Sequence, residues 1–443
     1  MLETLAELID AKKRKELKEF IAATNTIDLA GELEKLSKEY RVIFFRMLPK
    51  DAAANIFSYL SFDTQEDLIG SLTDPEIGHI VNGLFLDDAV DFIEEMPSSV
   101  VKRVLRNASS ETRQQINQLL HYKNDSAGSI MTTEYVDFKE QMTVAEAFKR
   151  IREVGMDKET IYTCYVTDDT RILDGVISVK TLLLSQDTDK IGDIMNTNFI
   201  AARTDDDREH VAELFQKYDL IALPVIDTEG QLVGIITVDD AMEVLEEEYT
   251  EDFQKMAAIK PFEKPYLTMG VVELAKKRIF WLLVLMFSAF FTGGIITHYE
   301  SLFVVFPVLI ASLPMLMNTS GNGGTQSSTL VIRGMAVGEL DTSDWWRILW
   351  KELRVGALVG GMLGSINIAH KWFLSGNIKL GMTIGLSLFA TVLISKVIGS
   401  MLPVLAKMTK VDPAIMAAPV LTTIVDAGVL IVYFFVATIV MGW

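Results

Sequence analysis

Residues 414–443 read AIMAAPVLTTIVDAGVLIVYFFVATIVMGW, and this stretch sets the fold class. It is apolar over more than the roughly 20 residues that a helix needs to cross the hydrocarbon core of a bilayer. Its one ionisable side chain is Asp426. A carboxylate at that depth is costly unless it faces water, a partner or an ion. The sequence therefore predicts a membrane-spanning helix that carries a functional carboxylate.

Four more apolar runs precede this one, at residues 279–296, 302–317, 355–369 and 380–405. We therefore expect five crossings and an integral membrane protein whose partner is the lipid bilayer. Basic residues gather at the ends that a five-crossing topology places in the cytosol: Lys276, Lys277, Arg278, Arg333, Arg347, Lys351, Arg354, Lys407 and Lys410. This asymmetry predicts a multi-pass protein of the cell membrane, with its N-terminal part in the cytoplasm and its C-terminus outside.

The second run continues into the uncharged polar sequence PMLMNTSGNGGTQSSTLVIR at residues 314–333. Irregular polar backbone is tolerated at membrane depth only where it is buried in protein or lines a wet cavity. We therefore expect a polar break within this crossing, with pore-lining side chains at Asn318, Asn322, Thr325 and Gln326. Their amide and hydroxyl oxygens suit a hydrated hard cation. A surface loop between two helices is the alternative.

Lys396, in the fourth run, is the candidate for neutralising Asp426 within the bundle. A structural pair between these two side chains is the alternative to a cation pathway. We favour the pathway because the run that carries Asp426 contains no lysine or arginine.

The first 264 residues differ from the rest in charge. They contain 29 lysines and arginines against 52 aspartates and glutamates, whereas the remaining residues contain 12 against 8. Such an acidic block repels nucleic acid and attracts cations, although solubility alone is the alternative explanation. An enzyme is not expected, because the sequence shows no nucleophile–base arrangement, no phosphate-binding loop and no zinc-ligand spacing. Its single cysteine, Cys164, also excludes a disulfide framework.

Residues 1–124 place apolar side chains at helical spacing throughout, which predicts an all-α domain of stacked helical hairpins. Asp87 and Asp91 are four residues apart, so both carboxylates lie on one helical face. Like charges in this position repel each other unless a cation lies between them. A solvated acidic face is the alternative.

Residues 125–245 contain an internal duplication. Ser129-Ile130-Met131 recurs as Asp193-Ile194-Met195, and the apolar strands at 162–166 and 175–179 recur at 222–226 and 234–238. Short strands that alternate with helices predict an α/β module present twice. A helix dense in acidic residues is expected next, over residues 239–260, and it leads directly to the membrane part.

Together these features resemble the MgtE family of magnesium channels over nearly the whole chain. The resemblance depends on the 314–333 sequence, on Asp412-Pro413-Ala414 and on APVLTTIVD at residues 418–426. The duplicated module is similar to a pair of cystathionine-β-synthase-type (CBS) domains. The family implies a helical N-terminal domain at 1–124, tandem CBS domains at 125–245, a connecting or plug helix at 246–264 and a transmembrane pore domain of five helices at 265–443. It further implies a homodimer with the pore on its two-fold axis.

The resemblance also assigns magnesium a double role, as transported ion and as regulator. At high cytosolic concentration the ion would bridge carboxylates between domains and pull the plug helices over the pore. The implied metal-binding residues are Asp426, Asp412, Asp87, Asp91, Asp207, Glu209, Asp219, Asp240, Glu243, Glu248, Glu251 and Asp252. A channel or carrier for manganese or cobalt, and a CBS-based membrane sensor without transport, are the alternative functions.

CBS pairs often bind an adenine nucleotide through a Ser/Thr-x-x-Asp ribose motif. The second repeat has this motif at Thr237 and Asp240, whereas the first repeat reads SVKT at 178–181 and lacks the acid. ATP is therefore expected at the second site if at either. A second departure from the family pattern is Ala418, which stands where other members carry a polar residue near the inner end of the pore.

Overall fold

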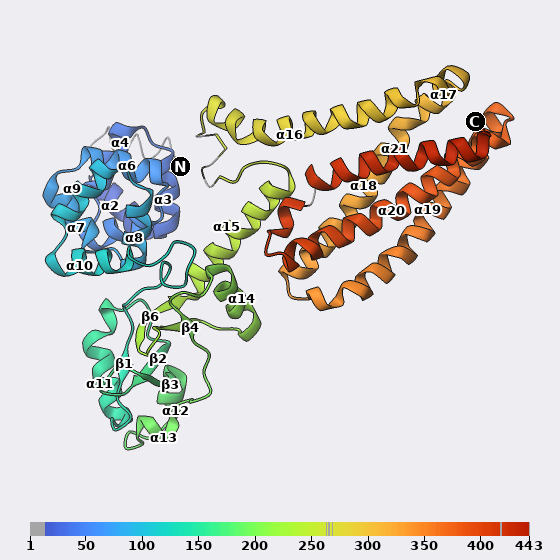
Figure 1. Ribbon diagram of the computed structural model, residues 1–443. Helices are drawn as coiled ribbons and strands as arrows, with labels where there is room; N and C mark the ends of the chain where they lie inside the picture. The colour runs from blue at the N-terminus through green and yellow to red at the C-terminus, as the bar shows by residue number, and fades with distance from the viewer. Residues whose placement is uncertain (1–13, 263, 265, 268, 417–418, 443) are drawn as a thin grey trace. The chain divides into compact units, whose positions relative to one another are not determined.

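The computed structural model describes residues 14–262, 264, 266–267, 269–416 and 419–442 (Figure 1). The chain divides between Glu246 and Glu247 into two compact units. The first unit contains a helical domain and two small mixed sheets, and the second contains long apolar helices. The predicted class, a multidomain membrane protein with an α-helical N-terminal domain and an α/β pair, is confirmed.

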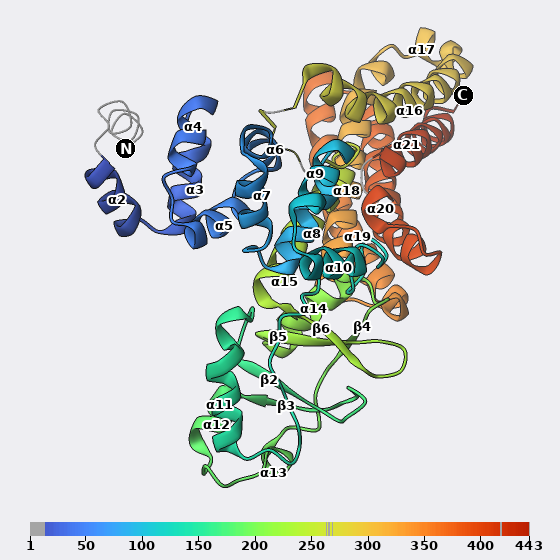
Figure 2. The same cartoon turned by 90° about the vertical axis from the view of Figure 1, so that its left-hand side faces the viewer.

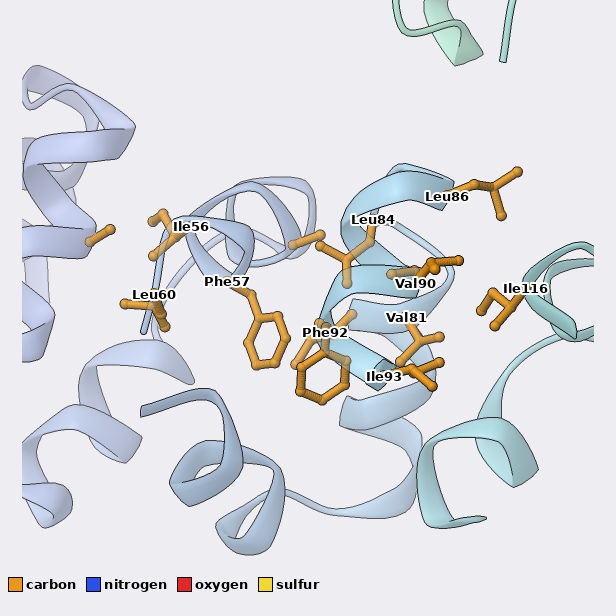
Figure 3. Packing of buried hydrophobic residues seen from close by; sticks show 14 of the residues in the cluster. Ile56, Phe57, Leu60, Val81, Leu84, Leu86, Val90, Phe92, Ile93 and Ile116 are labelled. Atoms are coloured by element: carbon orange, nitrogen blue, oxygen red, sulfur yellow. The ribbon is translucent and has the colours of Figure 1, made fainter. Parts of the chain in front are cut away.

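The N-terminal domain consists of short helices joined by tight turns. These helices are α2 (Arg14–Ala23), α3 (Thr26–Glu34), α4 (Lys38–Phe45), α5 (Lys50–Ser58), α6 (Phe62–Ser71), α7 (Asp74–Val81), α8 (Leu86–Glu95), α9 (Ser98–Asn107) and α10 (Ser110–Leu119). Each turns its apolar stripe inward, and Figure 3 shows the core that results. Phe57 and Phe92 meet there edge to face, with ring centroids 5.1 Å apart. This packing fixes α8, the helix that carries Asp87 and Asp91.

The α/β part contains two three-stranded sheets of the same topology. The strands are β1 (Asp137–Phe138), β2 (Thr163–Thr167), β3 (Leu173–Ser178), β4 (Ala202–Arg203), β5 (Ala222–Ile226) and β6 (Leu232–Thr237). In each sheet the first strand pairs parallel with the second, which pairs antiparallel with the third. The helices of this part are α11 (Val144–Val154), α12 (Val179–Leu184), α13 (Ile191–Ile194) and α14 (Arg208–Tyr218), with a 3₁₀ turn at Gly155–Asp157.

The duplication extends to details of backbone packing. The register shifts at the same place in both sheets, after Val166 in one and after Val225 in the other. A Cβ on Gly175 would lie 2.7 Å from the sulfur of Met195, and a Cβ on Gly234 would lie 2.7 Å from the sulfur of Met131. The recurring methionine motif of the sequence therefore packs on a recurring glycine of the third strand.

The acidic helix is α15 (Val238–Met256), which starts one residue before the predicted range and ends four residues before its end. The predicted boundary at residue 246 falls inside this helix. The membrane part follows with α16 (Val271–His298), α17 (Glu300–Val305), α18 (Val308–Ala336), α19 (Trp345–Ser375), α20 (Ile378–Met408) and α21 (Pro419–Met441), and with 3₁₀ turns at Thr342–Asp344 and Pro413–Met416.

In the membrane part, α20 packs against α18, α19 and α21 (Figure 1, Figure 2). Glycines permit these close approaches: a Cβ on Gly364 of α19 would lie 2.7 Å from the carbonyl oxygen of Gly385 on α20. Within the described residues, three helical segments are long and apolar enough to cross a membrane, namely Val271–His298, Ile378–Met408 and Pro413–Met441. The number of five crossings remains a prediction.

The prediction of a polar break in the second crossing is wrong. The chain is continuously helical from Val308 to Ala336, with Pro314 inside the helix. The polar side chains bond back to the preceding turn: the Thr325 hydroxyl donates to the carbonyl of Gly321 at 3.0 Å, and the Asn322 amide donates to that of Asn318 at 2.9 Å. Because such bonds satisfy the side chains within the helix, polarity at membrane depth does not require the backbone to unwind.

Candidate functional site

Asp426 lies in the first half of α21, and its side chain is half-buried. Among the described residues it forms no ion pair and no hydrogen bond. Lys396, the predicted alternative partner, is 5 % exposed and directs its ammonium group to the hydroxyl of Ser327 on α18, 3.4 Å away. The structural pair between Asp426 and Lys396 is therefore not formed. This leaves a carboxylate without a countercharge in an apolar helix.

The polar residues of α18 divide between two faces of the helix. Ser320, Gly324 and Ser327 are buried, and the hydroxyl of Ser395 on α20 donates to the carbonyl of Ser320. On another face the side chains at four-residue spacing are exposed, namely Asn318, Asn322 and Gln326, with Thr325 half-buried beside them. Exposed amide groups keep hydrogen-bonding capacity beyond their bonds within the helix, which water, an ion or a second chain can use at membrane depth. The predicted pore-lining residues therefore form one stripe.

In the first unit, carboxylates from three segments approach one another. We call this group the acidic cluster: Asp87, Asp88 and Asp91 of α8, Glu134 and Glu159 of the first repeat, and Asp239, Asp240 and Glu243 of α15. Asp87 is 8 % exposed. Glu134 Oε2 accepts from the backbone N–H of Leu86 at 3.2 Å, at the start of α8. The predicted pair at Asp87 and Asp91 therefore belongs to a larger assembly.

Burial, together with the charges of neighbouring carboxylates, raises the pKa values of six of these carboxyl groups, namely Asp87, Asp88, Asp91, Glu134, Glu159 and Asp240. The pKa of Glu159 rises to about 9, first through burial and then through the charges of Asp87 and Asp240. Burial, followed by the charge of Asp240, raises the pKa of Asp88 to about 6. The Asp91 side chain as a whole is exposed. Burial of its carboxyl group by the surrounding protein, followed by the charge of Asp87, nevertheless raises its pKa. The accumulated negative charge is a cost that a bound cation relieves.

The cluster does not contain a closed coordination shell. Within the described part of the chain, no three or more histidine, cysteine, aspartate or glutamate side chains converge as metal ligands. Magnesium dehydrates reluctantly and is usually held by one or two carboxylates, with its remaining positions filled by water. Carboxylate oxygens, the donors that this cluster supplies, are the ligand type that such a hydrated ion takes.

A second group of carboxylates lies in the second unit, where α15 ends. The ammonium group of Lys255 is 2.5 Å from Glu251 Oε1 and 2.6 Å from Asp412 Oδ2. Burial, followed by the charge of Asp412, raises the pKa of Asp252 to about 6. Three of the predicted metal ligands therefore lie together here, with a lysine between two of them. Glu248, one helical turn before Asp252, belongs to the same end of α15.

The predicted ligands of the second repeat do not form one site. Asp207 is the N-cap of α14, where its Oδ1 accepts from the N–H groups of Glu209 and His210 at 3.0 and 3.3 Å. Asp219 is the C-cap of the same helix, in the left-handed conformation with φ 52°. At 1.5 Å per residue, the two ends of this helix are roughly 15 Å apart. Asp207 and Asp219 therefore cannot hold one ion within a single chain.

Family models match the N-terminal domain, both repeats and the membrane part of the chain. The family model for the divalent cation transporter MgtE matches residues 313–436, that for the MgtE intracellular N domain matches 24–125, and the CBS domain model matches 127–186 and 191–247. Magnesium transporter MgtE of Thermus thermophilus is 35% identical over 99% of this chain and 98% of its own length. The chain belongs to the MgtE family. Magnesium transporter MgtE of Bacillus subtilis is 31% identical over 93% of each chain.

Solved structures of MgtE proteins match the soluble part. The cytosolic domain of the Mg²⁺ channel MgtE in complex with ATP is 35% identical and has a TM-score of 0.53, covering 55% of this chain and 100% of that structure. The soluble part of a magnesium transporter is 30% identical with the same TM-score, covering 56% of this chain and 97% of that structure. The family resemblance stated from sequence is confirmed, and the family model describes transporters.

Four members of the acidic cluster were not predicted as site residues: Asp88 and Asp239, which adjoin predicted ligands, and Glu134 and Glu159. Each of the last two is an isolated acid in a loop, and only the fold brings them to α8 and α15. Glu159 Oε2 is buried without a hydrogen-bond partner among the described residues. No periodicity or spacing could have indicated these two residues, because their contacts are tertiary.

The two residues of the predicted ribose motif, Thr237 and Asp240, hydrogen-bond to each other in this MgtE chain. The Thr237 hydroxyl lies 2.6 Å from Asp240 Oδ2, and its N–H donates to the same oxygen at 3.3 Å. In the first repeat the Ser178 hydroxyl accepts from the N–H of Thr181 at 3.1 Å and caps α12. The first motif therefore caps a helix, whereas in the second the threonine donates to the aspartate that would hold a ribose. Ala418, the other departure from the family pattern, lies outside the described residues.

Proposed function

We propose that this chain transports magnesium across the cell membrane, through a pore in which Asp426 binds the hydrated ion. One observation carries the proposal: a half-buried carboxylate without a countercharge lies within an apolar helix. Both MgtE relatives named above carry the name magnesium transporter. A carboxylate attracts a divalent cation, and binding through water requires no dehydrating cage.

The exposed amide stripe supports a pore formed by two copies. Asn318, Asn322 and Gln326 have no cover within one chain. A second copy related by a two-fold axis would convert the stripe into a lined pathway and would place two Asp426 carboxylates on one ion. A homodimer is therefore part of the proposal, as are a cytoplasmic first unit and a C-terminus on the outer side.

We infer further that cytosolic magnesium closes this pore. The acidic cluster gathers ionisable groups whose repulsion a cation relieves, and α15 carries carboxylates of this cluster and of the Lys255–Asp412 region. Magnesium bound among Asp87, Asp91, Asp240 and Glu243 would hold this helix in place, and ions at Glu248, Glu251, Asp252 and Asp412 would fix its other end. Asp207, Glu209 and Asp219 would contribute separate, weaker sites. Loss of the ion restores repulsion and releases the helix.

The proposal for ATP is narrower. The structure of a relative's cytosolic domain contains ATP, and Thr237 and Asp240 are the residues of this chain that would hold a ribose. Asp240 also lies in the acidic cluster, so an anionic nucleotide would have to bring magnesium with it or bind when the cluster is protonated.

Ion flux into liposomes tests the transport proposal. The full-length chain should admit Mg²⁺, and Asp426→Asn should reduce the flux at least about tenfold, because a carboxylate–cation contact is exchanged for a neutral amide. Glu339→Gln, a change at an exposed acid of the same unit, serves as the control and should retain the flux. Mn²⁺ and Co²⁺ in competition distinguish the alternative cargo. Normal Mg²⁺ flux through Asp426→Asn would remove this residue from the pathway.

A further inference from the structure

Among the described residues of the membrane part, Lys396 is the most deeply buried charged side chain, and it has no role in the function proposed above. It is 5 % exposed, and the Cδ of its stem would lie 3.7 Å from a Cβ on Gly356 of α19. A lysine ammonium in a bilayer normally reaches for the interface or for a counterion. Lys396 instead directs its ammonium group into the bundle.

The hydroxyl of Ser327 contacts charged groups from two other helices, the Lys396 ammonium group and the Glu352 carboxylate. Ser327 of α18 donates to Glu352 Oε2 of α19 at 2.6 Å, and the same hydroxyl lies 3.4 Å from Lys396 Nζ of α20. A serine hydroxyl has one proton to give and lone pairs to accept. It can therefore donate to the carboxylate while it accepts from the ammonium, so that the two opposite charges are joined through it.

Lys396 lies at the level of the proposed pore carboxylate. Ser395 and Ile398, its near neighbours on α20, line a small cavity together with Val425 and Gly428, which flank Asp426 on α21. The bundle thus places a lysine beside the segment whose function requires an uncompensated negative charge. Without another partner, Lys396 would pair with that carboxylate or repel the arriving cation.

We propose that Glu352 and Ser327 are positioning residues that hold the Lys396 ammonium away from Asp426 and so keep the pore carboxylate available to a cation. This inference rests on the proposed role of Asp426. Removal of one member of a buried charge pair leaves the other charge unsatisfied, whereas removal of both is far less harmful. The arrangement therefore makes a specific suppressor prediction.

Neutralising Glu352 should impair transport, and neutralising Lys396 as well should restore it. In liposomes, Glu352→Gln should lower Mg²⁺ flux by roughly tenfold, because the released ammonium group turns toward the pathway. The double variant Glu352→Gln/Lys396→Met should recover to within about threefold of wild type. Lys396→Met alone should transport normally, because Glu352 is only half-buried and keeps the Ser327 hydroxyl as a hydrogen-bond donor. Glu352→Gln combined with Lys379→Met, which removes an exposed lysine of the same helix, should stay impaired.

Size-exclusion profiles of every variant identify a loss of folding. The proposal is overturned if folded Glu352→Gln transports normally, if the double variant remains as impaired as Glu352→Gln, or if Lys396→Met alone abolishes flux. Failure of the pore proposal looks different, because Asp426→Asn would then transport normally whatever occupies position 396.

Discussion

Glu159→Gln should stabilise the arrangement of α8 against the first repeat in magnesium-free buffer. The Glu159 carboxyl group is surrounded by Asp87, Asp88 and Asp240, and its pKa rises from 4.5 to about 9. Ionised Glu159 therefore opposes the folded arrangement. Glutamine has nearly the same shape without a charge, so the substitution removes this opposition at any pH.

The size and sign of the effect follow from linkage. A carboxyl group with a raised pKa contributes stability that is fully present below its unfolded pKa of 4.5 and is lost as the pH rises toward about 9. By pH 7 the loss is at most roughly 3.4 kcal/mol, since each pH unit beyond 4.5 is equivalent to about 1.4 kcal/mol. Glu159→Gln should recover up to this amount at pH 7, and almost none of it at pH 5.

Hydrogen–deuterium exchange of the full-length protein reports this difference locally. Amides of α8 should exchange up to roughly 300-fold more slowly in Glu159→Gln than in wild type at pH 7 without magnesium. The gap should narrow at pH 5, and also on addition of Mg²⁺, which neutralises the wild-type cluster. Glu153→Gln, at an exposed position of α11, is the matched control. Equal or faster exchange in Glu159→Gln at pH 7 would refute the electrostatic reasoning.

Two further predictions concern helix packing and helix capping. Gly364→Ala should destabilise the bundle by about 1–3 kcal/mol in detergent melts, because its Cβ would meet the Gly385 carbonyl oxygen at 2.7 Å. Gly361→Ala, where a Cβ meets nothing within 4 Å, should be neutral, and equal melting temperatures for the two variants would disprove the close contact. Asp207→Ala should cost about 1 kcal/mol through loss of the cap on α14, seen as faster amide exchange at Glu209. Unchanged exchange there would show that the carboxylate does not cap the helix.

Patterns local in sequence predicted most of the fold. The repeated Ser129–Met131 and Asp193–Met195 motifs predicted two equivalent modules, and in the structure the methionine of each motif packs on the third-strand glycine of the other repeat. Helical spacing predicted the N-terminal domain, and the charge contrast at residue 264 separated the membrane part. Each of these features is a pattern of residue types along the chain, so a single sequence is enough to recognise it.

The error at residues 318–326 has a specific cause. Polar side chains within an apolar run were taken to need irregular backbone, yet hydroxyl and amide groups can bond to carbonyls one turn earlier in a regular helix. The continuous helix retains the predicted stripe, since Asn318, Asn322 and Gln326 remain exposed on one face. The sequence thus predicted which polar residues lie at membrane depth, whereas hydrogen bonds within the helix keep their backbone regular.

The acidic sites show the limit of the sequence more clearly. Helical spacing joined Asp87 to Asp91, but the approach of Glu134 and Glu159 depends on how the repeat folds against α8. The resemblance also listed Asp207 and Asp219 as acidic positions of the second repeat, and the structure places them at opposite ends of α14. Contacts between segments are set by tertiary packing, so the approach of Glu134 and Glu159 was not accessible from spacing.

Solvent access at position 426 tests the central claim most directly. Asp426→Cys, in the full-length protein reconstituted into liposomes, should react quickly with a membrane-impermeant maleimide, because the side chain would face an aqueous path. Phe435→Cys, an exposed apolar position on the same helix, should face lipid and react slowly, and wild type with its buried Cys164 serves as the blank. If Asp426→Cys reacts no faster than Phe435→Cys, the carboxylate does not face water and the proposed pore is contradicted.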